Sequence, residues 1–186
     1  MNVFLFAMLA WVALGLEIAL PPVLDAGAAG VQPSFLVPLL VFVALHTEPR
    51  PALWAGLVLG LLVDLVHPLA LVDGGGVTIP GPHALGFMLA ARLTLSIRGV
   101  VIRRNPVTLV ILSVLAAAVA ETVVVACMTL RSAFDGAVVW GGFGELFPGL
   151  LSALYTGLAA LVLSFPLFAL TPFFGFPPLP APRFAR

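Results

Sequence analysis

The sequence contains no lysine and few charged residues of either sign. Charged residues make up 9% of its 186 residues, against about a quarter in an average soluble domain, whereas 62% of the residues are hydrophobic. The formal net charge is zero, so there is no electrostatic basis for binding nucleic acid. The mean hydropathy of +1.21 predicts an integral membrane protein, which has the lipid bilayer as its surroundings.

Cysteine is also nearly absent. Cys127 is the single cysteine and lies in an apolar run, so one chain can form neither a disulfide nor a thiolate metal site. We interpret Cys127 as a packing residue. His46, His67 and His83 fall on different segments, and we therefore expect neither a metal nor another cofactor.

The apolar runs predict an all-α integral membrane protein with about six transmembrane helices in one bundle. They form a transmembrane domain over residues 1–172, and a Pro- and Phe-rich cytoplasmic tail follows at residues 173–186. Two of the spans are short for a bilayer core of about 30 Å and need protein neighbours. The predicted spans are Val3–Leu20, Pro33–Leu45, Ala52–Val66, Pro82–Ile97, Val107–Leu130 and Leu146–Ala169.

The arginines predict the orientation, because basic residues are retained in cytoplasmic loops. Arg50, Arg98 and Arg104 lie in turns on one predicted side, whereas the opposite loops are mainly acidic and contain Arg131 as their one basic residue. Both termini are therefore expected to be cytoplasmic. The first apolar run also fits a signal peptide, but it lacks a basic start and contains Glu17, which favours a retained helix.

Three acidic residues interrupt the apolar spans in the halves predicted to face the outer leaflet: Glu17, Asp64 and Glu121. Asp64 continues a row of small residues, Gly56 and Gly60, at four-residue spacing. This spacing places the three residues on one helix face and predicts the close approach of a neighbouring helix. Small residues at the same four-residue spacing also precede Glu121.

His83 opens the fourth span on the same side, so it and the three acids are expected to line one polar pocket. Two interpretations remain open: hydrogen bonds between helices for packing or assembly, or coordination of an ion or solute. Arg92 lies nearer the cytoplasmic end, where it either reaches the headgroups or pairs with an acid. The predicted packing and partner-binding residues are Gly56, Gly60, Asp64, His83, Glu17, Glu121 and Arg92.

The signatures of membrane enzymes are missing from the sequence. There is no HExxH motif, and Asp64 is the only aspartate inside a predicted span, so the pair of an intramembrane aspartyl protease is absent. Ser113, Ser152 and Ser164 lie on spans that contain no histidine. We therefore expect no catalytic function.

Several segments resemble the rod shape-determining protein MreD family. They are "GLLVD" at Gly60–Asp64, "GPHALGFMLAARL" at Gly81–Leu93, and "PSFLVPLLVFVAL" at Pro33–Leu45, which is similar to the second span of the family. Two features depart from the family pattern: the predicted outer loop with Gly74–Gly76 is longer, and the first span lacks the usual basic start.

The resemblance implies a multi-pass protein of the bacterial cytoplasmic (inner) membrane, similar in fold to the substrate-binding components of energy-coupling-factor vitamin transporters. It also implies a non-catalytic scaffold of the cell-elongation machinery. Such a scaffold binds the single-span protein MreC, and through it links MreB to the RodA and penicillin-binding-protein synthases of the cell wall. The alternative is a small-molecule (vitamin-like) binding subunit of a transporter. We expect few polar residues in the outer halves of the spans, which favours the scaffold.

Overall fold

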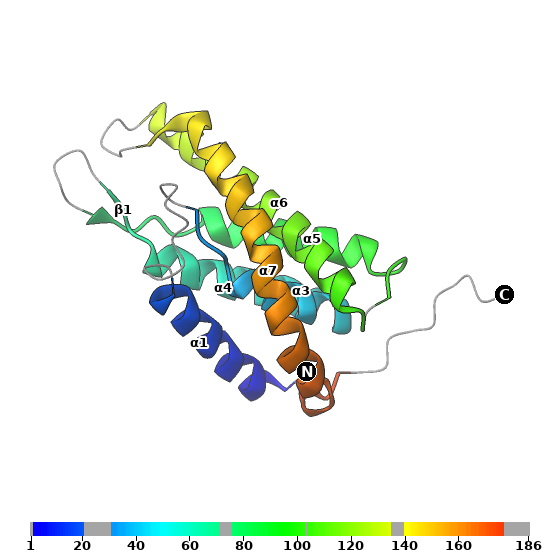
Figure 1. Cartoon of the computed structure of the whole chain (residues 1–186). Helices are drawn as coiled ribbons and strands as arrows, with labels where there is room; N and C mark the ends of the chain where they lie inside the picture. Colours follow the sequence, from blue (N-terminus) through cyan, green and yellow to red (C-terminus); the bar gives the residue numbers. More distant parts are fainter. Residues whose placement is uncertain (1, 21–30, 71–75, 103, 135–139, 177–186) are drawn as a thin grey trace.

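The computed structural model describes residues 2–20, 31–70, 76–102, 104–134 and 140–176. These residues form six α-helices and one small two-stranded sheet, which confirms the all-helical class (Figure 1). The helices are α1 (Val3–Ala19), α3 (Leu36–His46), α4 (Pro49–Val66), α5 (Pro82–Ile97), α6 (Pro106–Ser132) and α7 (Leu146–Leu170).

The remaining elements are short. Strands β1 (Leu69–Ala70) and β2 (Gly76–Val77) pair antiparallel between α4 and α5, with Leu69 opposite Val77. The 3₁₀-helix η1 (Gly142–Glu145) precedes α7, and η2 (Thr171–Phe174) follows it.

Local sequence signals explain where several helices begin. Pro49, Pro82 and Pro106 lie in the first turns of α4, α5 and α6, where proline is tolerated because a helix leaves its first N–H groups unpaired. The side chain of Asn2 caps α1, accepting hydrogen bonds from the backbone N–H groups of Phe4 (3.1 Å) and Leu5 (3.3 Å). The predicted and observed bounds of α5 coincide, and those of the other helices differ by a few residues.

Helix α3 is the centre of the bundle. It has only 11 residues, so it is about 16 Å long, and residues 36–45 are all buried. It contacts α1, α4, α5, α6 and α7. A helix with protein on every side is apolar all round. The short second span predicted from the sequence is therefore a core helix. Other helices surround it in place of lipid.

Three helical segments are long and apolar enough to cross a membrane: α4, α6 and the continuous stretch Gly142–Phe174 that includes α7. Helices α1, α3 and α5 have 17, 11 and 16 residues and fall short of that length. The structure thus supports a membrane protein with three helices of spanning length. It does not establish six crossings.

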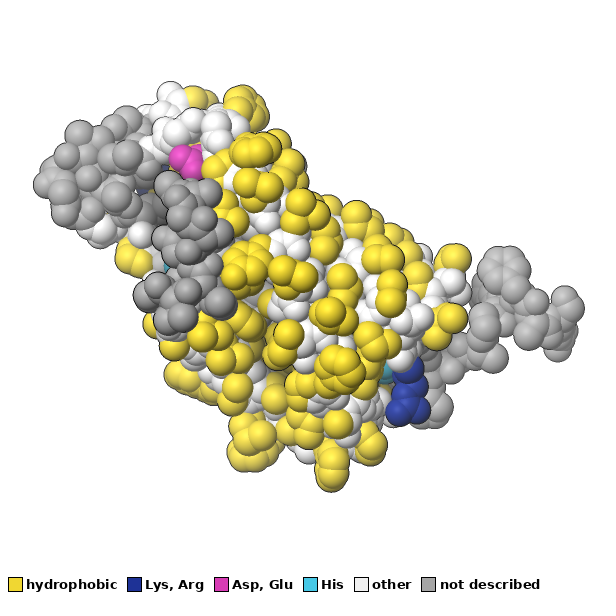
Figure 2. Space-filling model, in the orientation of Figure 1, with side chains coloured by type: hydrophobic (Ala, Val, Ile, Leu, Met, Phe, Trp, Pro, Cys, Tyr) yellow, Lys and Arg dark blue, Asp and Glu magenta, His cyan; other side chains and the backbone are white. Residues whose placement is uncertain are grey.

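Large apolar side chains cover the outside of the bundle, as Figure 2 shows in yellow. Trp11 of α1 and Phe165 of α7 are 73% and 69% exposed, which suits contact with lipid better than contact with water. Charged side chains gather instead at two opposite ends. We call them the acidic end (Glu17, Asp64, Glu121 and Glu145) and the arginine end (Arg50, Arg98 and Arg104).

The two ends of the described chain meet at the arginine end. The backbone N–H of Asn2 donates to the carbonyl of Phe174 (2.8 Å). Phe174 is fully buried against Phe42, and Phe176 stacks on both Phe174 and His46. Phe174 and Phe176, at the start of the predicted tail, therefore pack against the helix bundle. The rest of the expected tail, residues 177–186, lies outside the described residues.

Candidate functional site

Glycines bring α4 and α5 into direct backbone contact. A Cβ atom added to Gly60 would lie 2.5 Å from both the Ala84 Cα and the His83 carbonyl oxygen, and one added to Gly56 would lie 2.9 Å from the Phe87 carbonyl oxygen. The helix face of α4 that carries Gly56 and Gly60 therefore packs against α5.

Helix α5 meets α6 through a glycine that the sequence analysis did not single out. A Cβ atom on Gly86 would lie 2.9 Å from the carbonyl oxygen of Ala120. The sequence does contain a signal for this contact, namely a second pair of small residues four apart, Gly86 and Ala90. Both residues are buried.

The Asp64 carboxylate caps the first turn of α5. Its Oδ2 atom accepts hydrogen bonds from the N–H groups of Gly81 (2.8 Å) and Ala84 (3.3 Å), and Oδ1 accepts from the N–H of His83 (3.1 Å). His83 Nδ1 also donates to Oδ1 (2.7 Å). Residue Gly81 holds the N-cap position and has no side chain to fulfil this role, so a carboxylate from α4 replaces it. Asp64 is 3% exposed, which leaves it no surface for direct contact with a partner.

The Glu17 carboxylate likewise caps the first turn of α3. Its Oε2 atom accepts hydrogen bonds from the N–H groups of Phe35 (2.6 Å) and Leu36 (3.3 Å), where the N-cap residue Phe35 offers no polar side chain. At the other end of α3, Arg98 of the α5 C-terminus donates to the carbonyls of Ala44 (3.2 Å) and Thr47. Negative charge at the N-terminus and positive charge at the C-terminus both match the helix dipole. In the sequence, Arg98 indicates only the orientation of the chain, and its contact with α3 depends on the packing of α5.

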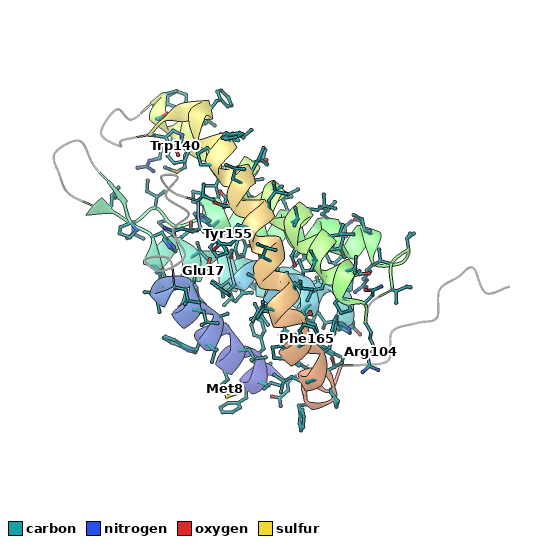
Figure 3. The ribbon with its side chains drawn as sticks, in the orientation of Figure 1. Met8, Glu17, Arg104, Trp140, Tyr155 and Phe165 are labelled. Carbon is teal, nitrogen blue, oxygen red and sulfur yellow. The ribbon has the colours of Figure 1, made fainter. Side chains whose placement is uncertain are left out.

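A cavity of about 220 Å³ opens beside these caps at the acidic end. Glu17, His83 and Glu121 line it together, although they come from α1, α5 and α6. Asp64 does not line it and lies behind His83. Three of the four residues expected in one polar pocket are therefore in it. In Figure 3, Glu17 and Trp140 mark this end of the molecule, and Arg104 lies at the opposite end.

The cavity wall is more polar than the sequence analysis expected. Hydroxyl groups of α7 contribute to it: Thr156 Oγ1 accepts a hydrogen bond from the N–H of Ser34 (2.9 Å), and Ser152 Oγ accepts from the N–H of Gln32 (3.1 Å). The expectation of few polar residues was wrong because it considered each span alone. The segment before α3 and one face of α7 supply these groups jointly.

Glu121 occupies a distinct position in the cavity. It is half-buried on α6 and lies against α7, where a Cβ atom on Gly149 would be 3.2 Å from its Oε2 atom. No hydrogen bond to its carboxylate is formed within the described residues, unlike the carboxylates of Glu17 and Asp64. Glu145 lines the same cavity and is exposed, so it lies at the mouth.

Arg92 is not part of this site. Its side chain is exposed on α5 and does not line the cavity. The described part of the chain also brings together no group of three or more histidine, cysteine, aspartate or glutamate residues able to hold a metal ion.

Comparison of the chain with protein-family models, with curated proteins and with solved structures finds no match in any of the three. The functional interpretation therefore depends on the residues and their geometry.

Proposed function

We propose that this chain is a non-catalytic scaffold of the bacterial cell-elongation machinery in the cytoplasmic (inner) membrane. In this proposal it crosses the membrane six times, has both termini in the cytoplasm and binds an MreC-like single-span protein. Through that partner it connects MreB to the RodA and penicillin-binding-protein synthases.

One observation supports the proposal above the others. The two segments that resemble the MreD family, Gly60–Asp64 and Gly81–Leu93, are separate in sequence and form one joint in space. Gly60 packs against the backbone of His83 and Ala84, and Asp64 caps the same turn. The shared residues therefore fix the arrangement of two helices, which is the role expected of motif residues in a scaffold.

The proposal also needs a surface on which a single-span helix could pack. The exposed apolar faces of α6 and α7 offer one, because Val107, Leu154, Leu158 and Leu161 line a shallow groove between the two helices.

The test is affinity purification of the tagged protein from its native membranes in mild detergent, followed by mass spectrometry. We expect a single-span coiled-coil protein and wall-elongation enzymes to co-purify. The Asp64→Asn variant should recover several-fold less of this partner per unit of purified protein, because the α4–α5 joint is disturbed. The matched control is Glu48→Gln, which changes an exposed carboxylate that makes no capping hydrogen bond. Equal partner recovery from Asp64→Asn and the wild type would contradict the role given to Asp64.

A second candidate function is that of a small-molecule (vitamin-like) binding subunit of a transporter. The polar cavity favours it, since several hydrogen-bonding side chains converge there with an apolar wall, as in many ligand sites. The same purification distinguishes it, because a transporter subunit should recover a pair of ATPases with their membrane coupling subunit, or retain a stoichiometric small ligand.

A further inference from the structure

We propose that the cavity at the acidic end binds the primary ammonium group of a small organic molecule. The inference rests on the charges and hydrogen-bonding groups of the cavity and is independent of the scaffold function. It narrows the ligand class of the second candidate function.

The charge balance of the cavity favours a cationic ligand. The carboxylate of Glu17 is compensated by the N–H groups at the start of α3. Glu121 and Glu145 accept no comparable hydrogen bonds from described N–H groups, and the basic residues among the described cavity lining are the histidines His67 and His83, of which His83 interacts electrostatically with Glu121. Arg131 lies ten residues further along α6 than Glu121 (131 − 121 = 10), about 15 Å away along the helix axis.

Three of the loops outside the described residues have no basic side chain that could supply a cation. Residues 21–30, 71–75 and 135–139 contain no arginine, lysine or histidine. The two histidines of the cavity are the remaining bases: His83 donates its Nδ1 proton to Asp64, and His67 donates from Nδ1 to the carbonyl of Val63 (3.2 Å). An anionic ligand would be repelled by Glu121 and Glu145, and a neutral one would supply no counter-charge to either carboxylate.

The hydrogen-bonding groups of the cavity favour a ligand that donates hydrogen bonds. Thr156 Oγ1 donates to the Ser152 carbonyl and accepts from the Ser34 N–H, which leaves one lone pair for a further donor. The Glu121 carboxylate accepts no hydrogen bond from a described residue. Thr156 and Glu121 therefore present acceptors to the cavity, and a primary ammonium carries three donors around one compact charge.

The remainder of the ligand faces an apolar wall. Val37, Phe87, Val125 and Trp140 line the same cavity, and Trp140 is fixed because its Nε1 atom donates to Thr129 Oγ1 (3.2 Å). This wall suits a short carbon chain. The volume of about 220 Å³ is below the roughly 300–1,000 Å³ of sites for drug-sized ligands, so the ligand is compact.

The experiment uses the full-length protein in nanodiscs of phosphatidylglycerol, which carries no amine, and isothermal titration calorimetry. Four probes share a two-carbon frame: ethanolamine, choline, ethylene glycol and glycolate. We expect saturable binding of ethanolamine, at least tenfold tighter than that of the other three. Choline is the sharpest comparison, since it keeps the positive charge and has no N–H donor.

Variants connect the binding to the cavity. Glu121→Gln should weaken ethanolamine binding at least tenfold, and Glu145→Gln, a change at an exposed position that folding tolerates, should weaken it severalfold. Glu48→Gln at the other end of the molecule should bind as the wild type does. Repeating the titration with phosphatidylethanolamine in the nanodiscs identifies the source of the amine: competition indicates a lipid headgroup, and unchanged binding indicates a soluble amine.

The proposal is overturned if ethanolamine does not bind saturably, if choline or ethylene glycol binds as tightly, or if both glutamate variants keep the wild-type affinity. None of these outcomes affects the co-purification result, so a failure here is separate from a failure of the scaffold proposal.

Discussion

Asp64 and Glu17 show why an apolar chain retains carboxylates inside its helices. Each lies beside the N-terminus of a neighbouring helix whose own N-cap residue, Gly81 or Phe35, has no side chain able to accept a hydrogen bond. Unpaired N–H groups in an apolar environment cost several kcal/mol each. The carboxylates thus accept hydrogen bonds from N–H groups for which neither lipid nor the local sequence provides an acceptor.

Replacing Asp64 should destabilise the protein in a graded way. Asp64→Ala removes the acceptor for three backbone N–H groups, and we expect a loss of about 2 kcal/mol or more. Asp64→Asn keeps one carbonyl oxygen and should fall between the alanine variant and the wild type. Thermal unfolding in detergent measures both, with Glu48→Ala as the control at an exposed carboxylate. Equal melting temperatures for Asp64→Ala and the wild type would exclude the capping role.

Gly60 provides a second test on the same joint. In Gly60→Ala the new methyl group meets the backbone of His83 and Ala84, which cannot rotate away, so α5 must shift. We expect a loss of about 1–3 kcal/mol, as for other overpacked cores. Gly15→Ala in α1 is the matched control, because nothing lies within 4 Å of its added Cβ. That change should be neutral or stabilise α1 by up to about 1 kcal/mol. A Gly60→Ala variant as stable as Gly15→Ala would show that the helices are not in contact here.

At the scale of elements, α3 has an unusual combination of properties. It is short and buried over residues 36–45, and its two ends are held by Glu17 of α1 and by Arg98 at the C-terminus of α5. A helix of 11 residues is marginal in isolation. Its stability must therefore come from the surrounding helices and from these two charged contacts.

Removing either contact should loosen the corresponding end of α3. In Glu17→Gln we expect faster hydrogen exchange at the amides of Phe35 and Leu36, which donate to Glu17 in the wild type. In Arg98→Ala the exchange should rise in the last turn of α3 instead. Arg92→Ala, which removes an exposed arginine from the same helix as Arg98, is the control and should leave α3 unchanged. Hydrogen exchange with mass spectrometry resolves these segments, and uniform exchange along α3 in all three variants would contradict the two-ended arrangement.

At the scale of the whole molecule, the charged residues distinguish one end of the helix bundle from the other. Arg50, Arg98 and Arg104 lie at one end, where Glu48 is also found, and Glu17, Asp64, Glu121 and Glu145 lie at the other, where Arg131 ends α6; an apolar surface lies between them (Figure 2). The tendency of basic residues to remain in the cytoplasm predicts that the arginine end faces inward.

Labelling of single cysteines tests this orientation. In a Cys127→Ser background, Val100→Cys places a thiol in the turn after α5, and Phe143→Cys places one in η1 at the opposite end. Both positions are exposed, at 89% and 75%. We expect a membrane-impermeant maleimide to label Phe143→Cys in intact spheroplasts, and Val100→Cys only after permeabilisation. The reverse pattern would invert the predicted orientation.

The sequence alone determined the helical class and the helix positions, because both depend on local signals. Long apolar runs require helices, and proline at the first turn, as at Pro82, determines where a helix begins. Spacing alone also placed Gly56, Gly60 and Asp64 on one face, since helical periodicity fixes which residues share a side.

The tertiary structure decided what those residues contact. Periodicity gives the face that Gly60 occupies but does not identify α5 as its neighbour, and it does not reveal that Asp64 and Glu17 cap other helices. The polar cavity depends equally on packing, since residues such as Ser34, Glu121 and Thr156 lie on segments far apart in the chain. Local sequence determines helices because their hydrogen bonds are local, whereas a cap or cavity built from several helices exists only once they are packed together.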